Sequence, residues 1–348
     1  MKKKGRMRIS PTSKPRIFIT MGDPSGIGPE VIMKSMASPE LKGLAIFVIV
    51  ADAGVMERAS ISVYNGRIAV HVLKEKQKEV SLEEEAVNVV DPGSPLKDCQ
   101  PGEPTDEGSR KALACLDTAM RLMREARDDA PKAMVTAPVS KENIARIYPG
   151  FTGHTEYLQQ AYSSELVTMV MVGKNLRVVP VTRHIPLKEV ASSLTADLIV
   201  GTLAQVSRNR ALISGREDPL IGVCALNPHC GEGGKIGREE IDVIAPAVEK
   251  ARHVYGNIEG PISADVIFYK AIKNKIDIVV SMYHDQCLSP FKMVDFDSGV
   301  NMTLGLDHVR TSPDHGTAFD IAGKGVAGSA SMEQAIKLAL RAITHSDM

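Results

Sequence analysis

Short runs of apolar, β-branched residues recur along the chain, and each run ends in turn residues. These runs predict buried strands at Arg16–Thr20, Ala45–Val50, Ala133–Val139, Val167–Val172, Arg177–Thr182, Leu220–Leu226, Ile278–Tyr283 and Gly299–Leu306. Between them, apolar residues at intervals of three and four predict helices, the longest over Glu107–Arg127 and the last over Ser331–Ile343. Strands that alternate with helices and lack a two-residue alternation are typical of a largely parallel sheet covered on both faces. The pattern therefore predicts an α/β fold.

The composition favours a packed protein whose partners are neither nucleic acid nor membrane. The 348 residues suffice for two domains, and 43% of them are hydrophobic, so a large core can form. Basic and acidic residues number 42 each, and this balance gives no reason to expect nucleic acid or an anionic membrane as partner. Basic residues gather in 1–14, which we expect to be a flexible tail. No apolar run follows that would serve as a signal peptide or membrane span.

The cysteines point to a reducing compartment. They are scattered and odd in number, and no two of them form a CxxC pair; they are Cys99, Cys115, Cys224, Cys230 and Cys287. Such spacing does not predict a disulfide framework, and a cytoplasmic location fits better.

Three histidines follow three predicted strands. His184 comes after Arg177–Thr182, His229 after Leu220–Leu226, and His284 directly after Ile278–Tyr283. In open α/β sheets, ligands bind outside the carboxyl ends of the strands, so these side chains are expected to face one crevice. Three neutral imidazoles with one open position are the ligand set of a catalytic zinc site. The trio therefore predicts a metal centre.

Other interpretations of this trio stay open. Each histidine taken alone fits an ordinary strand-end residue, and Cys230 and Cys287 lie close enough in sequence to serve as ligands instead. Asp265 and Asp285 are natural hydrogen-bond partners that would fix the imidazole tautomers.

Candidate anion-binding residues lie in three stretches. The turn Gly22–Glu30 opens a helix but lacks the GxGxxG dinucleotide fingerprint, so a tight turn is an equally good interpretation. The other side chains with suitable donors are His154 and Thr155, at an expected helix start, and Lys292, Asn301 and Arg310 downstream of His284.

Several motifs of the sequence match those of one protein family. The sequence resembles the 4-hydroxythreonine-4-phosphate dehydrogenase family of pyridoxine biosynthesis, from residue 17 to about 340. The matching blocks are ITMGDPSGIGPE (19–30), TAPVSK (136–141), FTGHTE (151–156), HIPL (184–187), LNPHCGEGG (226–234), MYHDQ (282–286), and GVNMTLGL through DHGTA (299–318).

The resemblance implies a two-domain α/β/α fold like that of the isocitrate and isopropylmalate dehydrogenases, with a cleft between the domains. A discontinuous dinucleotide-binding domain is expected over 15–145 plus 290–348, and a metal-binding and dimerisation domain over 146–289. The family works as a homodimer with the active site at the subunit interface.

The resemblance also assigns site residues. It implies that His184, His229 and His284 hold a divalent metal: zinc, with magnesium, cobalt and manganese as alternatives. It implies substrate contacts for His154, Thr155, Lys292, Asn301 and Arg310. The sequence departs from the family's pattern at Arg183, Cys230 and Cys287, and small residues are expected in relatives at the two cysteine positions.

A more distant likeness concerns the cofactor. His315–Gly325 looks like the adenosine-binding loop of the isopropylmalate dehydrogenases, where an acidic residue accepts hydrogen bonds from the ribose hydroxyls. Asp320 matches that residue, which favours NAD over NADP. The cofactor-binding residues implied by this likeness are His315, Gly316, Ala318, Asp320 and Ile321.

The activity that the resemblance implies is metal-dependent oxidation of 4-phosphohydroxy-L-threonine, followed by decarboxylation. Asp265, Asp285 and a metal-bound water are all candidates for the general base. Relatives that oxidise D-threonate or D-erythronate 4-phosphate, or a cyclic diol carboxylate, are the alternative within the dehydrogenases. Outside them, the same fold class includes phosphate acyltransferases, which need neither metal nor nicotinamide. A regulator that binds metal or phosphate without catalysis is the weakest alternative.

Overall fold

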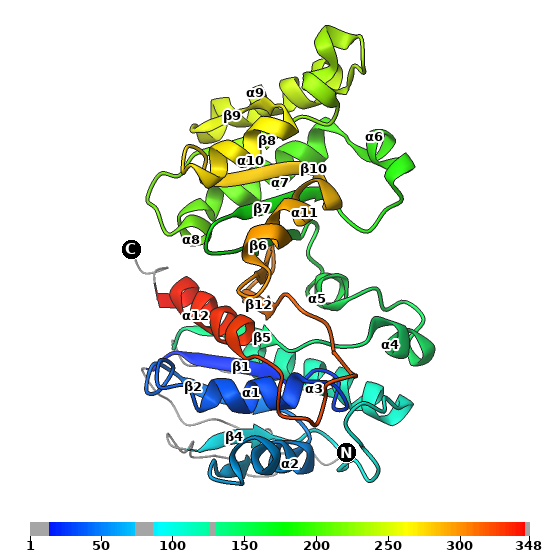
Figure 1. Ribbon diagram of the computed structural model, residues 1–348, viewed down its shortest axis with the longest axis vertical. Coiled ribbons are helices and arrows are strands. Elements are labelled where there is room, and N and C mark those ends of the chain that lie inside the picture. Colours follow the sequence, from blue (N-terminus) through cyan, green and yellow to red (C-terminus); the bar gives the residue numbers. More distant parts are fainter. Residues whose placement is uncertain (1–13, 74–85, 126–129, 345–348) are drawn as a thin grey trace. The chain divides into compact units, whose positions relative to one another are not determined.

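The computed structural model describes residues 14–73, 86–125 and 130–344. Most of the expected tail 1–14, and the end of the helix expected to reach Arg127, lie outside these residues. The chain divides into two compact units, Met1–Leu158 with His308–Met348, and Gln159–Asp307. Figure 1 shows the elements of both units.

The first unit is built on a parallel sheet in the order β3-β4-β2-β1-β5-β12. Its described strands are β1 (Arg16–Thr20), β2 (Ile46–Val50), β3 (Val70–Leu73), β4 (Val87–Val90), β5 (Lys132–Thr136) and β12 (Val309–Pro313). All five residues of β1 are buried, as expected for a strand with both faces covered.

Helices pack against this sheet. The described ones are α1 (Gly28–Met36), α2 (Ala53–Tyr64), α3 (Asp106–Glu125), α4 (Lys141–Ile147) and α12 (Ala330–Thr344). Helix α3 packs on β1, β2 and β5, while α12 packs on β12 and β5 and lies beside α1 (Figure 1). Helix α5 (His154–Tyr162) contains the boundary between the two units.

The second unit has a mixed sheet in the order β11-β6-β7-β10-β8-β9. Its described strands are β6 (Thr168–Val172), β7 (Arg177–Thr182), β8 (Ile221–Cys224), β9 (Ile258–Ile262), β10 (Ile278–Tyr283) and β11 (Val300–Leu304). β7, β10, β8 and β9 run parallel to one another, whereas β6 is antiparallel to both β7 and β11.

The helices of the second unit enclose an apolar core. They are α6 (Val190–Ser193), α7 (Ala196–Arg208), α8 (Arg210–Ser214), α9 (Ala245–Tyr255), α10 (Ala264–Ile272) and α11 (His284–Asp295). Short segments of other helical types or tight turns are η1 (Leu187–Glu189), η2 (Pro228–Gly234) and η3 (Glu240–Ile244). One core cluster joins Val178, Val279, Ile267 and Phe291, so β7 and β10 share a buried layer with α10 and α11.

Two further findings bear on expectations from the sequence. All five cysteines are free thiols, and four of them are buried. Of the helices in the described ranges, none by itself has the length and apolar composition to cross a membrane. One pair, Leu187–Ser193 and Ala196–Arg208, meets those criteria together but is bent by 90°.

Candidate active site

Two of the three predicted ligand histidines lie side by side. β7 and β10 are parallel neighbours in which Thr182 pairs with Tyr283, and the Thr182 hydroxyl donates to the Met282 carbonyl at 2.8 Å. His184 follows this register point by two residues and His284 by one. The sheet therefore brings their rings together, with centroids 5.7 Å apart and planes inclined by 46°.

This spacing fits two ligands of one metal ion. Zinc-to-nitrogen bonds of about 2.1 Å in tetrahedral geometry place the centroids of two ligating imidazoles about 5 Å apart. The Nδ1 atom of His284 lies 2.7 Å from the Asp285 carboxylate, a contact that orients the ring and leaves its Nε2 for a ligand. The two rings thus have the separation that a metal site requires. His284 also has the carboxylate contact that is typical of a metal-binding histidine.

His229 lies on a strained turn. Five successive residues of η2 adopt left-handed backbone angles, from His229 (φ 51°, ψ 35°) to Gly233 (φ 64°, ψ 27°). For a residue other than glycine this region costs about 1–2 kcal/mol, and it occurs as a rule at single positions. Three of the five are not glycine, so the strain is concentrated at the turn that presents the exposed His229.

A buried carboxylate holds this turn in place. Glu240 is 3% exposed, and its Oε1 accepts hydrogen bonds from the backbone N–H groups of Leu226 and Asn227 at 2.8 and 2.7 Å. Its Oε2 accepts from the Asn227 amide at 2.9 Å. A Cβ on Gly231 would lie 2.9 Å from the same oxygen, so the turn packs directly on Glu240.

The third ligand is not in place in this arrangement. Within residues 14–73, 86–125 and 130–344, no three His, Cys, Asp or Glu side chains are grouped so as to hold a metal ion. His229 instead lies within electrostatic reach of Asp265, whose pKa is lowered first by a 2.5 Å hydrogen bond from the Ser263 hydroxyl and also by the charge of His229. Asp265 is thus an ionised carboxylate near the third predicted ligand.

Lys292 and Asn301 come from neighbouring elements of the second unit. Lys292 lies near the end of α11, with its Nζ 5.1 Å from the centroid of the Phe296 ring. Asn301 lies on β11 opposite Met171. Among the described residues, its buried side-chain oxygen accepts no hydrogen bond, so it is available as an acceptor.

Arg310 and His154 belong to the first unit, where they form one charged cluster. Arg310 lies on β12 and is 3% exposed; its Nη2 donates to the Thr136 hydroxyl at 2.6 Å. Burial lowers the pKa of Arg310 to about 10, and the charge of Glu156 opposes that shift. A buried guanidinium held at one nitrogen by a strand residue is suited to a bidentate contact with an anion.

The imidazole of His154 is neutral at physiological pH. Although part of the residue reaches solvent, burial of the ring lowers its pKa to about 3, and the positive charges of Arg310 and Lys141 add to that shift. A neutral histidine donates at one ring nitrogen and accepts at the other. Thr155 follows it in the first turn of α5, so both predicted substrate contacts begin this helix.

The glycine-rich turn before α1 is occupied by protein. Gly22 has φ 75°, and a Cβ on it would lie 2.3 Å from the Pro138 carbonyl oxygen. The Asp23 N–H donates to that oxygen at 2.9 Å, and the Ile27 N–H donates to the Thr317 carbonyl at 2.9 Å. The turn is therefore a packing device and not an open phosphate-binding loop.

The predicted cofactor loop runs along α1, between β12 and α12 (Figure 1). Glu30 accepts a hydrogen bond from the Gly323 N–H, and Lys34 donates to the carbonyls of Gly325 and Ala327 at 2.8 and 2.6 Å. Asp320 is exposed within this loop. The other residues assigned to the cofactor occupy the same segment: His315, Gly316, Ala318 and Ile321.

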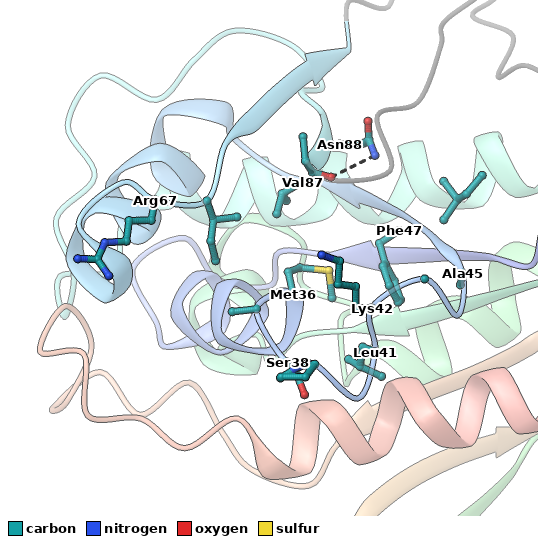
Figure 2. A pocket seen from close by; sticks show the side chains of 15 residues that line it. Met36, Ser38, Leu41, Lys42, Ala45, Phe47, Arg67, Val87 and Asn88 are labelled. Atoms are coloured by element: carbon teal, nitrogen blue, oxygen red, sulfur yellow. Dashed lines mark hydrogen bonds between the residues drawn. The ribbon is translucent and has the colours of Figure 1, made fainter.

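A cavity in the first unit holds none of the predicted site residues. Its volume is about 380 Å³, and Figure 2 shows Met36, Leu41, Phe47 and Val87 among the side chains around it. It opens where β2 and β4 begin, which is the edge opposite to the carboxyl ends of the strands. The position of this cavity and the residues that line it thus distinguish it from the candidate site.

Four residues of these clusters carried no role in the sequence interpretation: Thr136, Lys141, Glu156 and Glu240. The first three lie inside the family motifs 136–141 and 151–156. Their position in these motifs is the feature of the sequence that could have indicated a role at the site. Glu240 acts on residues 13 and 14 positions away, a separation that no local pattern reveals.

Comparison with known proteins identifies the family of this chain. The family model "Pyridoxal phosphate biosynthetic protein PdxA" matches residues 43–339. The chain is 42% identical over 337 residues to 4-hydroxythreonine-4-phosphate dehydrogenase of Geobacter metallireducens, covering 94% of this chain and 96% of that protein. It is 37% identical over 328 residues to D-threonate 4-phosphate dehydrogenase of Cupriavidus necator, covering 93% and 96%.

A solved structure agrees. That of 4-hydroxythreonine-4-phosphate dehydrogenase from Klebsiella pneumoniae superposes with a TM-score of 0.79 at 36% identity, covering 94% of this chain and 99% of that one. The predicted isocitrate dehydrogenase-like α/β fold is confirmed by this likeness. The chain therefore belongs to the PdxA family and is, like the relatives named above, a dehydrogenase.

Proposed function

We propose that the protein oxidises 4-phosphohydroxy-L-threonine with NAD, in a reaction that depends on a divalent metal. The secondary alcohol loses a hydride to NAD and a proton to a base, and the resulting 3-keto acid loses CO₂ to give 3-amino-2-oxopropyl phosphate. The observation that carries this proposal is the pair His184 and His284, whose rings lie 5.7 Å apart at the ends of adjacent parallel strands.

Each unit would contribute a separate part of the chemistry. In the second unit, His184, His284 and His229 would hold the metal, with zinc as our first choice. When bound, the metal would lower the pKa of the reacting hydroxyl. The contact of Asp285 with the His284 ring supports a role in orienting that ring, and the exposed, ionised Asp265 is a candidate for the base that takes the proton.

The first unit would recognise an anionic group and the cofactor. The buried Arg310 supplies a charged fork, and His154 supplies a neutral donor or acceptor. The nicotinamide would accept the hydride, while the loop that contains Asp320 would hold the adenosine end. The remaining substrate contacts in this proposal are Thr155 of the first unit, and Lys292 and Asn301 of the second.

The same proposal includes a homodimer in a cytoplasmic setting. Both the homodimeric state and the cytoplasmic setting are carried over from the family resemblance.

D-Threonate 4-phosphate is the second candidate substrate, because a relative of similar identity is named for it. A panel of phosphorylated hydroxy acids, assayed for NADH formation, separates the two. We expect 4-phosphohydroxy-L-threonine to give the highest kcat/KM. A higher value with D-threonate or D-erythronate 4-phosphate would contradict the first choice and favour the second.

Cofactor preference should depend on Asp320. Replacing it by asparagine is expected to weaken NAD binding by roughly 1–3 kcal/mol, because a charged acceptor for the ribose hydroxyls is lost. NADP should lose less, since its 2′-phosphate is repelled by the carboxylate. The measurement is the ratio of kcat/KM for NAD to that for NADP in both proteins. An unchanged ratio would show that Asp320 does not contact the ribose.

A further inference from the structure

Lys141 reaches the start of α5 from the neighbouring helix α4. A Cβ on Gly153 would lie 3.3 Å from Lys141 Cε, 3.5 Å from its Nζ, and 3.0 Å from Glu156 Oε2. The lysine side chain and the carboxylate therefore flank Gly153, the residue directly before His154. Lys141 thus belongs to the cluster that contains His154 and Arg310.

The charges of this cluster favour an anion. Lys141 and Arg310 both act on the ring of His154, and the carboxylate of Glu156 acts on Arg310 in the opposite sense. Two cations beside a neutral imidazole favour an anion, and the single charge of Glu156 offsets only part of theirs. Because Arg310 is buried, its field is screened less by solvent than that of a surface residue.

The backbone that carries Lys141 is fixed. The Ala137 N–H donates to the Thr20 carbonyl at 3.1 Å, and Pro138 accepts from Asp23. Ser140 caps α4 by accepting from the Asn143 N–H at 3.2 Å. An anion that binds Lys141 therefore orders only its side chain, which keeps the entropic cost of binding low.

We propose that Lys141 is a further substrate-binding residue, which holds the phosphate group together with Arg310 and His154. The inference rests on the proposed function, because it assumes that the substrate is phosphorylated. Lys141 supplies a mobile point charge, whereas Arg310 supplies a fixed fork, so the two cations contact different oxygens of one phosphate.

The test compares Lys141→Met and Lys141→Arg with the wild type, as full-length, metal-saturated protein. Three quantities are measured: the Kd for inorganic phosphate, the KM for the phosphorylated substrate, and Tm. Lys141→Met should raise both constants about 10-fold, and Lys141→Arg should restore most of the loss. Lys42→Met is the matched control, because this exposed lysine precedes β2 at the opposite edge of the same sheet; it should change neither constant.

Three outcomes would overturn the inference. The first is a wild type that binds no phosphate, and the second is an unchanged phosphate Kd in Lys141→Met. The third is a lower Tm in that variant with unchanged Kd and KM, which would mean that Lys141 serves Glu156 alone. If no panel substrate is oxidised but phosphate binding still falls in Lys141→Met, the proposed function fails and the anion site stands.

Discussion

Replacing His184 or His284 by alanine should remove the bound metal and lower kcat by at least about 10³-fold, a barrier increase of about 4 kcal/mol. The centroids of the two rings lie 5.7 Å apart, so each variant would delete one of two adjacent ligands from the proposed set of three histidines. The measurement is metal content per subunit together with turnover. Neither ring is buried, so both variants should keep the wild-type Tm of the metal-free protein.

His229→Ala should behave in the same way if its turn completes the ligand set. His253→Ala is the matched control, because His253 is an exposed histidine on α9 of the same unit. Asp285→Asn should lose about 10- to 100-fold in metal affinity, since it orients His284 without being a ligand. Any histidine variant that keeps full metal content and full rate would remove that residue from the ligand set.

Arg310→Lys should lower kcat/KM for the phosphorylated substrate about 10- to 100-fold, that is by about 1.5–3 kcal/mol. The guanidinium is buried, and its Nη2 donates to the Thr136 hydroxyl at 2.6 Å, which fixes the orientation of its plane. A lysine ammonium lacks this planar fork and cannot bind Thr136 and two phosphate oxygens in the same geometry. The substrate would then be placed poorly, so kcat should fall together with the rise in KM.

A two-by-two comparison measures this effect. Wild type and Arg310→Lys are each assayed with 4-phosphohydroxy-L-threonine and with 4-hydroxy-L-threonine, which lacks the phosphate. The wild type should use the phosphate-free substrate poorly, and the variant should lose little more on it. Equal losses on both substrates would place Arg310 at a carboxylate or in a structural role, and a Tm measurement separates those two.

Part of the fold followed from local pattern. The bounds of β1, β7 and β10 are those predicted, because each strand is an apolar, β-branched run with a clear end. β12 was missed: its sequence VRTSP has few apolar residues, and it is buried through pairing with β5. The antiparallel pairing of β6 with β7 and β11 also lies beyond the pattern, since strand direction depends on partners and not on composition.

The candidate site, like the fold, was predictable from the sequence only in part. The proximity of His184 and His284 was predictable, because both residues follow the carboxyl ends of strands. In a parallel sheet these ends lie at the same edge, and here the two strands are neighbours. The left-handed turn of His229 was not predictable, because cysteine and glutamate rarely adopt that conformation, and histidine adopts it more often but not in a run of five such residues. It depends on Glu240 and on the packing of Gly231. The metal, substrate and cofactor roles of these residues remain predictions.

Oxidation of 4-phosphohydroxy-L-threonine by this protein should require a bound metal ion. The measurement follows NADH formation from that substrate before metal removal, after removal by a chelator, and after the metal is restored. We expect NADH formation in the first sample, almost none in the second, and recovery in the third. NADH formation at the full rate by metal-free protein would show that the dehydrogenase does not depend on a metal.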